Sequence, residues 1–228
     1  MKRRREDYPQ VNYIDNKGIQ YIELNRGCLR QCPFCYSDPN YKTFRIPQIR
    51  SNLVQIIGEN ILYDYEIKKK IKELGRINFN NKKVYYGLSQ GIDRRILTPE
   101  IIQLLVENKI GLITKKGRWY KGMRISWDGH LSQMGQVKRT IEALEKAGYK
   151  RNYISVFMLV NWKISFKECM QKFRIIKKWK VSIDDCTWNT TKKEMKPHFW
   201  TRLELKKFRD KCRVHNIRMR FRGYYKIK

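Results

Sequence analysis

The sequence predicts an α/β fold built as a partial barrel of six strand–helix units, and three observations support this. Segments with strand-like and helix-like apolar patterns alternate along most of the 228 residues. Repeated strand–helix units place parallel strands in one sheet with the helices outside. A complete barrel of eight units usually takes about 250 residues, and this chain is shorter. We therefore expect a partial (βα)6, TIM-like barrel.

The first half of the chain supplies three strands and two helices of this pattern. We expect strands at 19–24, 54–57 and 82–88, and helices at 65–74 and 98–109. The helix at 98–109 has the clearest start, because Thr98 is a residue type that caps helices and Pro99 occupies the first helical position. Gly58 ends the second strand.

The second half continues the alternation. We expect strands at 123–127, 152–162, 180–184 and 217–225, and helices at 134–149, 165–179 and 201–215. The run at 152–162 is almost entirely apolar, as in a strand that is buried on both faces. Ser165 is placed to cap the helix that follows this strand, and Gly148 ends the helix that precedes it.

The chain shows no internal repeat, no low-complexity segment and no linker rich in Pro, Gly or Ser. We therefore expect one barrel domain over residues 19–228, preceded by a basic N-terminal lead-in at 1–18. In such barrels the chemistry lies in the loops after the carboxyl ends of the strands. Polar or reactive residues occupy these loops at 28–35, 58–60, 89–93, 127–130 and 161–162.

Basic residues dominate the charge of the chain. Lys and Arg number 51 against 21 Asp and Glu, which gives a formal net charge of +30. Such a field attracts polyanions, so nucleic acid is the first candidate partner. A lysine-rich background without a specific partner is an equal alternative, because the basic residues spread over the whole chain. Segments 114–124 and 218–228 interleave cations with aromatic rings, which is typical of a surface for single-stranded nucleic acid and also of a half-buried edge.

The sequence contains no run of about 18 apolar residues, so we expect no transmembrane helix and no membrane partner. The N-terminal segment is basic but lacks the apolar core of a secretory signal. These observations predict a cytoplasmic protein. In a reducing cytosol, clustered cysteines indicate metal binding or catalysis rather than disulfides.

Three of the six cysteines lie within eight residues, directly after the first strand. Cys28, Cys32 and Cys35 have the spacing C-x3-C-x2-C, so one short loop can hold three thiolates around one metal centre. A closed zinc site needs a fourth ligand, and no further His or Cys lies nearby in the sequence. A [4Fe–4S] cube normally takes four thiolates, so three would leave one iron open to another ligand. Structural zinc and a redox-active cysteine pair are the alternatives.

The nine residues GCLRQCPFC (27–35) combine these cysteines with a glycine, a proline and an aromatic residue. Placed after the first strand of a βα series, this segment resembles the signature of the radical S-adenosyl-L-methionine (radical SAM) superfamily, and the likeness extends over about residues 19–180. The resemblance implies a radical SAM barrel in which the three cysteines hold three irons of a [4Fe–4S] cluster. It further implies that SAM chelates the fourth iron and is cleaved reductively to a 5′-deoxyadenosyl radical.

The resemblance also implies contacts for SAM. The segment Gly58-Glu59-Asn60 stands where the family has a GGEP segment for the amino group of SAM, although it has one Gly and no Pro. The other implied contacts are Phe34 and Val160 for adenine, and Ser126 and Asp128 for ribose.

The stretch SQGIDRRILTPE (89–100) resembles an under-described branch of radical SAM proteins that has a QGLD-R-LT-E stretch after the third strand. This likeness makes Gln90 and Asp93 candidates for contact with the SAM carboxylate or the substrate, although Asp93 is equally placed to cap the following turn. Cys186, at the end of the sixth strand, is a third catalytic candidate, with a buried structural thiol as the alternative. His130 is a candidate acid or base.

We therefore predict a radical SAM enzyme with one cluster and SAM, served by a flavodoxin-like or ferredoxin-like reducing partner. Two hypotheses exist for its substrate. The first is a nucleic acid or a protein bound to one, and the second is a small molecule or peptide. A third hypothesis is a non-catalytic nucleic-acid-binding protein that uses the three cysteines for structural zinc. The salt dependence of nucleic-acid binding and the identity of the metal separate these hypotheses.

Overall fold

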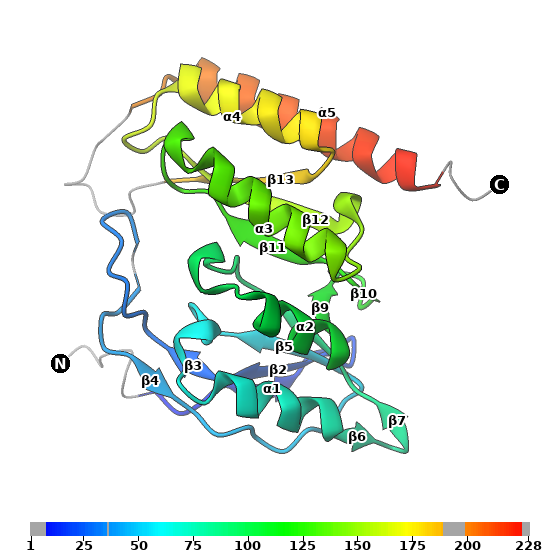
Figure 1. Ribbon diagram of the computed structural model, residues 1–228. Helices are drawn as coiled ribbons and strands as arrows, with labels where there is room; N and C mark the ends of the chain where they lie inside the picture. The colour runs from blue at the N-terminus through cyan, green and yellow to red at the C-terminus, as the bar shows by residue number, and fades with distance from the viewer. Residues whose placement is uncertain (1–7, 36, 189–198, 225–228) are drawn as a thin grey trace. The chain divides into compact units, whose positions relative to one another are not determined.

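Figure 1 shows the computed structural model of the protein, which describes residues 8–35, 37–188 and 199–224, with the side chains of the last helix described up to residue 220. The chain divides into two compact units, residues 1–123 and residues 124–228. Each unit has a β-sheet and helices of its own.

A six-stranded sheet forms the centre of the first unit, in the order β1-β2-β5-β8-β9-β10. Its strands are β1 (Asn12–Ile14), β2 (Gln20–Glu23), β5 (Leu53–Ile57), β8 (Tyr85–Leu88), β9 (Ile110–Ile113) and β10 (Trp119–Tyr120). The four inner strands are parallel to one another. The edge strands β1 and β10 pair antiparallel with their neighbours.

Two helices, α1 (Ile67–Arg76) and α2 (Pro99–Glu107), pack in the first unit. Tyr86 of β8 donates its hydroxyl hydrogen to the carbonyl oxygen of Leu74 in α1 at 2.8 Å, so α1 lies against the face of the sheet that bears Tyr86. Side chains alternate across a strand. Glu23 and Ile57, which are opposite each other in the register of β2 and β5, therefore point away from this helix-covered face.

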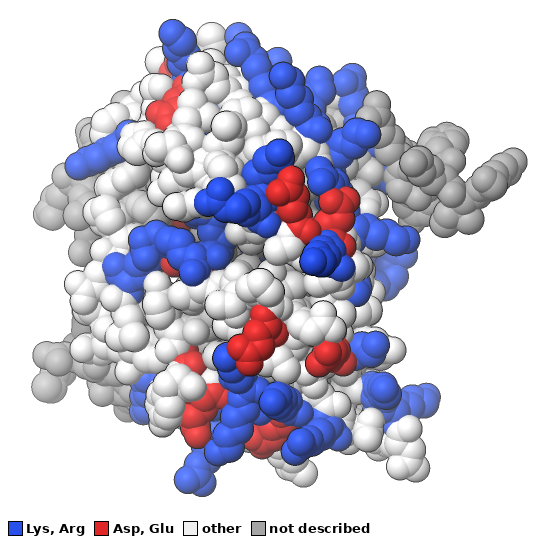
Figure 2. Space-filling view, viewed as in Figure 1, with Lys and Arg blue, Asp and Glu red and all other residues white. Residues whose placement is uncertain are grey.

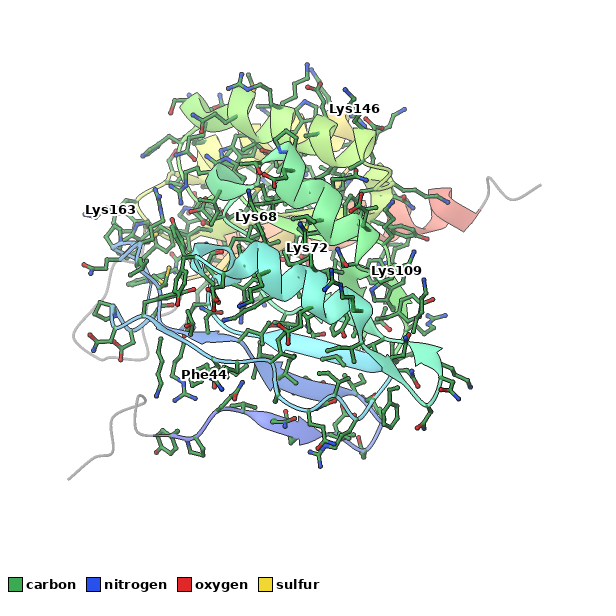
Figure 3. The ribbon with its side chains drawn as sticks, turned by 60° about the horizontal axis from the view of Figure 1, so that its bottom comes forward. Phe44, Lys68, Lys72, Lys109, Lys146 and Lys163 are labelled. Atoms are coloured by element: carbon green, nitrogen blue, oxygen red, sulfur yellow. The ribbon has the colours of Figure 1, made fainter. Side chains whose placement is uncertain are left out.

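Two short antiparallel ladders complete the first unit. They are β3 (Asn25–Arg26) with β4 (Lys42–Thr43), and β6 (Asn78–Phe79) with β7 (Lys82–Lys83). Phe44 follows β4, and the cationic groups of Arg26 and Lys42 lie 5.2 and 5.4 Å from its ring centre, within the range of a cation–π contact (Figure 3). The β3–β4 ladder closes the loop that contains the three clustered cysteines.

In the described residues of the second unit, a three-stranded sheet in the order β11-β12-β13 is accompanied by three α-helices. The strands are β11 (Met123–Ser126), β12 (Ile154–Val160) and β13 (Ser182–Thr187), and the helices are α3 (Met134–Lys146), α4 (Phe166–Trp179) and α5 (Arg202–Tyr224). β12 and β13 are parallel over six residue pairs. All but one of the residues of β12 are buried, as its apolar sequence predicts.

The strands and helices predicted before residue 200 are present, with some ends shifted by a few residues. Both predicted caps are confirmed. Thr98 Oγ accepts a hydrogen bond from the N–H of Ile101 at 3.2 Å, and Ser165 Oγ accepts one from the N–H of Glu168 at 3.1 Å. These side chains satisfy donors that the first turn of a helix leaves without partners.

The predicted closing strand at 217–225 is wrong over its described residues, because α5 continues through them to Tyr224. Apolar and basic residues alternate there, which suggested a strand. The same apolar residues also continue a helical spacing, because Cys212, His215 and Met219 are buried on one face of α5. The packing of this face stabilises the helix. In the described structure, no strand pairs with this segment. Residue 225 lies outside the described residues.

The hairpin of β9 and β10 was not predicted from the sequence. It contains Trp119, whose indole N–H donates to the carbonyl oxygen of Tyr86 at 3.1 Å and whose ring lies 4.9 Å from that of Tyr85. Segment 114–124 was interpreted either as a surface for single-stranded nucleic acid or as a half-buried edge. The contacts of Trp119 agree with the half-buried edge. Gly117 forms the turn with a φ of 70°, a conformation that favours glycine.

The structure is thus a mixed α/β fold with parallel inner strands in the first unit. Closure of the strands into one partial barrel stays a prediction, as does a single domain over 19–228. The N-terminal lead-in contains β1, which extends the first sheet at its edge.

Candidate functional site

The three clustered cysteines lie in one loop of the first unit, between β3 and β4. The N–H of Cys28 donates to the carbonyl oxygen of Asp38 at 2.9 Å, which ties the start of the loop to its end. The N–H of Cys35 donates to the carbonyl oxygen of Cys32 at 2.8 Å, which forms a turn between these two residues. Backbone hydrogen bonds therefore shape the loop around its thiols.

Gly27 makes this closure possible. Its φ is 78°, in the region that favours glycine. A Cβ atom at this position would lie 2.1 Å from the carbonyl oxygen of Asn40 and 2.8 Å from that of Asp38. Both carbonyl groups belong to the returning side of the loop. The residue before the first cysteine must therefore be a glycine for the two sides to approach this closely.

None of the three cysteines is part of a disulfide, and they differ in exposure. Cys28 and Cys32 are half-buried, whereas Cys35 is exposed. Burial raises the pKa of the Cys28 thiol, and its electrostatic interactions with Cys35 and Glu59 raise it further. A bound cation would reverse this effect, because it stabilises thiolates.

Glu59 connects the cysteine loop to the end of β5. Its Oε2 accepts a hydrogen bond from the N–H of Gly27 at 2.9 Å. Gly58 precedes it with a φ of 150°, and a Cβ atom there would lie 2.2 Å from Oδ1 of Asn25. The structure thus brings together the cysteine loop and the segment 58–60, which lie about 30 residues apart in the sequence.

Two buried amide oxygens lie in this part of the first unit. Oδ1 of Asn25 and Oδ1 of Asn60 have no hydrogen-bond partner among the described residues, and both side chains belong to buried residues. Buried acceptors without partners are unfavourable, so they mark places where a ligand with N–H or O–H groups would be stabilised. Asn60 was predicted from its position, whereas Asn25 was missed, because no sequence pattern distinguishes it.

Asp93 contacts the cysteine loop from the segment after β8. Its carboxylate accepts hydrogen bonds from the Nε–H of Arg95 at 2.6 Å and from the hydroxyl of Tyr63 at 3.3 Å, and it lies 3.8 Å from Nε of Arg30 in the cysteine loop. Burial raises the pKa of Asp93, although the positive charge of Arg30 acts against this rise. The carboxylate also accepts a hydrogen bond from the N–H of Arg95. The turn-capping alternative is therefore confirmed, and a role toward a ligand stays a prediction.

The first unit also contains a cavity of about 730 Å³. The residues that line it are Tyr8, Pro9, Gln10, Val11, Asn12, Tyr13, Glu23, Arg26, Ile57, Gly58, Glu59 and Gln90. The cavity therefore joins the predicted site residues Gly58, Glu59 and Gln90 to the N-terminal segment. Sequence reasoning missed this segment, because a strand of three residues gives too short a pattern to predict.

The polar floor of this cavity is an ion pair between Arg26 and Glu23, both of which are buried. The guanidinium of Arg26 also donates to the carbonyl oxygen of Tyr8 at 2.7 Å and to that of Pro9 at 3.0 Å. The hydrogen bonds that Arg26 donates to Glu23 raise the pKa of Arg26, and the charge of Glu59 raises it further. Arg26 thereby fixes the N-terminal segment beside Glu59 while keeping its own charge compensated.

Four predicted site residues lie in the second unit. Ser126 and Asp128 are half-buried at the end of β11 and in the loop after it, Val160 is buried at the end of β12, and Cys186 is half-buried in β13. The N–H of Trp188 donates to the carbonyl oxygen of Val160 at 2.9 Å. These four residues therefore belong to the carboxyl ends of the strands of this sheet, as predicted.

His130 has a partner that the sequence did not indicate. Its Nδ1 lies 3.2 Å from Oε2 of Glu168 on α4, and the same carboxylate accepts a hydrogen bond from the N–H of Leu131 at 2.8 Å. These hydrogen bonds outweigh burial and lower the pKa of Glu168. Glu168 thus joins the loop after β11 to the start of α4, which makes the pair primarily a structural contact.

The remaining cysteines are structural, as expected. Cys169 on α4 and Cys212 on α5 are buried, and burial raises the pKa of Cys169 to about 11. Within the described part of the chain, no group of three or more His, Cys, Asp or Glu side chains is arranged closely enough to hold a metal ion. A metal in the cysteine loop would therefore need its side chains to reorient, and Cys35 is exposed enough to do so.

The comparisons with known proteins do not assign the chain to a family. No protein-family model matches it, and no curated protein matches it either. Among the helices that the structure describes, none is both long and apolar enough to cross a membrane.

Proposed function

We propose that this protein is a radical SAM enzyme, in which Cys28, Cys32 and Cys35 hold a [4Fe–4S] cluster. The observation that carries this proposal is the hydrogen bond between Gly27 and Glu59, which joins the cysteine loop to the segment expected to bind SAM. This contact places Glu59, which follows β5, beside the residue that precedes the first cysteine.

The residues present fit the cluster and SAM chemically. Three thiols on one loop supply three soft ligands, and the exposure of Cys35 leaves the loop open on one side. Glu59 offers a carboxylate, and the Oδ1 atoms of Asn25 and Asn60 are buried acceptors without partners among the described residues. An ammonium group, such as that of SAM, is the type of donor that these oxygen atoms accept.

The chemistry of the cofactor and the task of the protein are separate. With SAM, a reduced cluster of this kind supplies a 5′-deoxyadenosyl radical for hydrogen abstraction. The chain itself holds the cluster through its three thiols and orients SAM with Glu59 and Asn60. Phe34, in the cysteine loop, remains a proposed contact for adenine, and the roles expected of Ser126, Asp128 and Val160 stay predictions.

The size of the cavity in the first unit indicates a substrate whose reacting group is small. Its volume of about 730 Å³ accommodates a small organic molecule or one residue of a larger chain. Gln90 and Glu59 line it, so a group bound there would lie beside the proposed SAM contacts. A flavodoxin-like or ferredoxin-like reductase remains the proposed electron donor.

The test is anaerobic reconstitution of the full chain with iron and sulfide, followed by reduction with dithionite in the presence of SAM. Iron, sulfide and 5′-deoxyadenosine are then measured for the parent protein, for Cys32→Ala and for Cys169→Ala. The last variant is the matched control, because it removes a thiol outside the loop.

We expect about four irons per chain and 5′-deoxyadenosine from the parent protein and from Cys169→Ala, and neither from Cys32→Ala. Stoichiometric zinc without 5′-deoxyadenosine would contradict the proposal and favour a structural zinc site. Equal iron in all three proteins would show that the loop is not the cluster site.

A further inference from the structure

The exposed face of α5 carries an ordered arrangement of cations. One face of this helix is buried in the second unit through Phe208, Cys212, His215 and Met219. The spacing of four, three and four residues is that of a single helix face. His215 Nε2 lies 2.8 Å from the carbonyl oxygen of Val181, which fixes the helix against the sheet. The opposite face is therefore the one that solvent or a partner meets.

Cations form two rows along this exposed face. An α-helix turns by about 100° per residue. On this scale the positions of the first row fall within about 60° of arc. Those of the second row fall within about 40° of arc, on the other side of the exposed face. The first row consists of Arg202, Lys206, Arg209, Arg213 and Arg220, and the second of Lys207, Lys211 and Arg218, all exposed. From Arg202 to Arg220 the first row spans about 27 Å along the helix axis.

Three aliphatic side chains and the exposed carboxylate of Asp210 lie in the seam between the two rows. Leu203, Val214 and Ile217 are 74%, 47% and 41% exposed, respectively. Their helical positions lie between those of the cation rows. The two rows of cations are therefore separated by a seam of mixed character.

Some exposed cations on the helices form ion pairs with carboxylates. Lys68 and Lys69 of α1 and Lys138 of α3 each form an ion pair with a glutamate. Arg209 of α5 pairs with Asp185 at 3.4 Å. The other exposed cations of the two rows have no carboxylate partner among the residues that the structure describes. Their charge is therefore available to an anionic partner.

The choice of residue type also points to phosphate recognition. Arginine outnumbers lysine six to three within α5, whereas lysine is the more frequent of the two over the whole chain. A lysine-rich background would not produce this reversal. Arginine presents a planar set of donors that binds phosphate with two hydrogen bonds, so it is the cation preferred for nucleic-acid contacts. In Figure 2, Lys and Arg side chains are visible where α4 and α5 lie, and also over the other helices.

We propose that the exposed face of α5 binds double-stranded DNA, with the helix in the major groove. The groove of B-form DNA admits an α-helix, and the two cation rows would then face the phosphates on its two sides. The deep and narrow major groove of A-form RNA does not admit a helix. Single-stranded nucleic acid is favoured by exposed aromatic rings, and the described part of this face has none. This proposal does not depend on the cluster chemistry.

The experiment measures binding of the full chain to a labelled DNA duplex by fluorescence anisotropy over a series of salt concentrations. The test variant replaces Lys206, Arg213, Arg218 and Arg220 by glutamine. The matched control replaces Lys68, Lys69, Lys72 and Arg76 of α1, a helix of the other unit on which Figure 3 labels Lys68 and Lys72. Both variants change the net charge by the same amount, and circular dichroism checks that both are folded.

We expect the α5 variant to lose at least about 100-fold in affinity near physiological salt and to reduce the slope of log affinity against log salt by about 3 to 4. The α1 variant should lose less than about threefold. Equal losses in the two variants would overturn the proposal, because binding would then follow net charge alone. A Val214→Asp variant places a second negative charge in the seam, one turn from Asp210, and should also weaken binding.

Two further arms test the partner itself. Duplex RNA should bind more weakly than DNA, and binding of RNA with equal affinity and equal dependence on α5 would contradict the groove assignment. Vesicles of anionic lipid should show no preference for the parent over the α5 variant. Binding to such vesicles without binding to DNA would replace the nucleic-acid partner by a membrane surface. Cys32→Ala should bind DNA like the parent, so failure of the cluster chemistry and failure of this proposal are distinguishable.

Discussion

Oε2 of Glu59 accepts a hydrogen bond from the backbone N–H of Gly27 at 2.9 Å. This contact joins the carboxyl end of β5 to the residue before the first clustered cysteine. In the proposed enzyme this carboxylate has two tasks, because it holds the loop and also contacts SAM. The two tasks can be separated by substitution.

Glu59→Gln keeps an acceptor for the N–H of Gly27 but removes the charge, whereas Glu59→Ala removes both. A hydrogen bond to a charged group contributes about 1.5 to 3 kcal/mol, so both variants should lose about 10- to 100-fold in SAM affinity. Only Glu59→Ala should also lower the iron content after reconstitution. Equilibrium dialysis with SAM and iron analysis measure these effects.

Glu73→Ala, on the exposed side of α1, is the control. A normal SAM affinity of Glu59→Gln would contradict the proposed charge interaction.

Gly27→Ala tests the closure of the cysteine loop, and Gly18→Ala is its matched control. Both glycines have positive φ values, of 78° and 76°, but a Cβ atom at Gly18 meets nothing within 4 Å. Gly18→Ala should therefore cost about 1 kcal/mol of unfolding free energy from backbone strain alone. Gly27→Ala should cost about 3 kcal/mol, because the backbone of Asn40 must also move.

Chemical denaturation measures both costs, and iron analysis after reconstitution measures their effect on the loop. Gly27→Ala should bind little iron, whereas Gly18→Ala should bind as much as the parent. If both variants lose the same free energy, the close approach of Asn40 is not what restricts position 27.

The sequence predicted those parts of the site that follow long, regular elements. The cysteine loop and Glu59 come after β2–β3 and β5, whose apolar patterns are clear, so their place at the carboxyl ends of strands could be predicted. Parallel strands next to each other bring their carboxyl ends together, which explains why the two segments meet. The likeness to a known motif predicted the chemical role, which spacing alone could not do.

The remaining parts depend on tertiary contacts that no local pattern encodes. The N-terminal segment lines the cavity because Arg26 donates to the carbonyl oxygens of Tyr8 and Pro9, and these residues lie in a segment without periodic apolar positions. The end of α5 was predicted as a strand because apolar and basic residues alternate there. Over a few residues, such a pattern fits the period of a strand as well as that of a helix. Met219 settles the choice by packing on the same face as His215.

Lys70 and Asp64 form an ion pair in which both side chains are almost fully buried. Lys70→Met leaves the carboxylate buried without its partner, and we expect a loss of about 3 to 5 kcal/mol of unfolding free energy. The double variant Lys70→Met with Asp64→Asn should regain most of this loss. Asparagine keeps the oxygen that accepts from the N–H of Glu66 and removes the uncompensated charge. Denaturation of the two variants measures this difference, and an equally large loss in the double variant would contradict the explanation.

Glu168 should make the stability of the second unit depend on pH. Its pKa in the folded protein is lowered from 4.5, because hydrogen bonds from Leu131 and His130 outweigh the effect of burial. A carboxyl group with a lowered pKa stabilises the fold at pH values above its pKa in the unfolded state. This contribution is lost as the pH falls from about 4.5 through the pKa in the folded state.

Glu168→Gln should therefore cost about 1 kcal/mol of unfolding free energy at neutral pH and progressively less as the pH falls below 4.5. Thermal denaturation as a function of pH measures this convergence, with Glu142→Gln, exposed on α3, as the control. A constant difference between the parent and Glu168→Gln across this range would show that the carboxylate stabilises the loop by packing rather than by its charge.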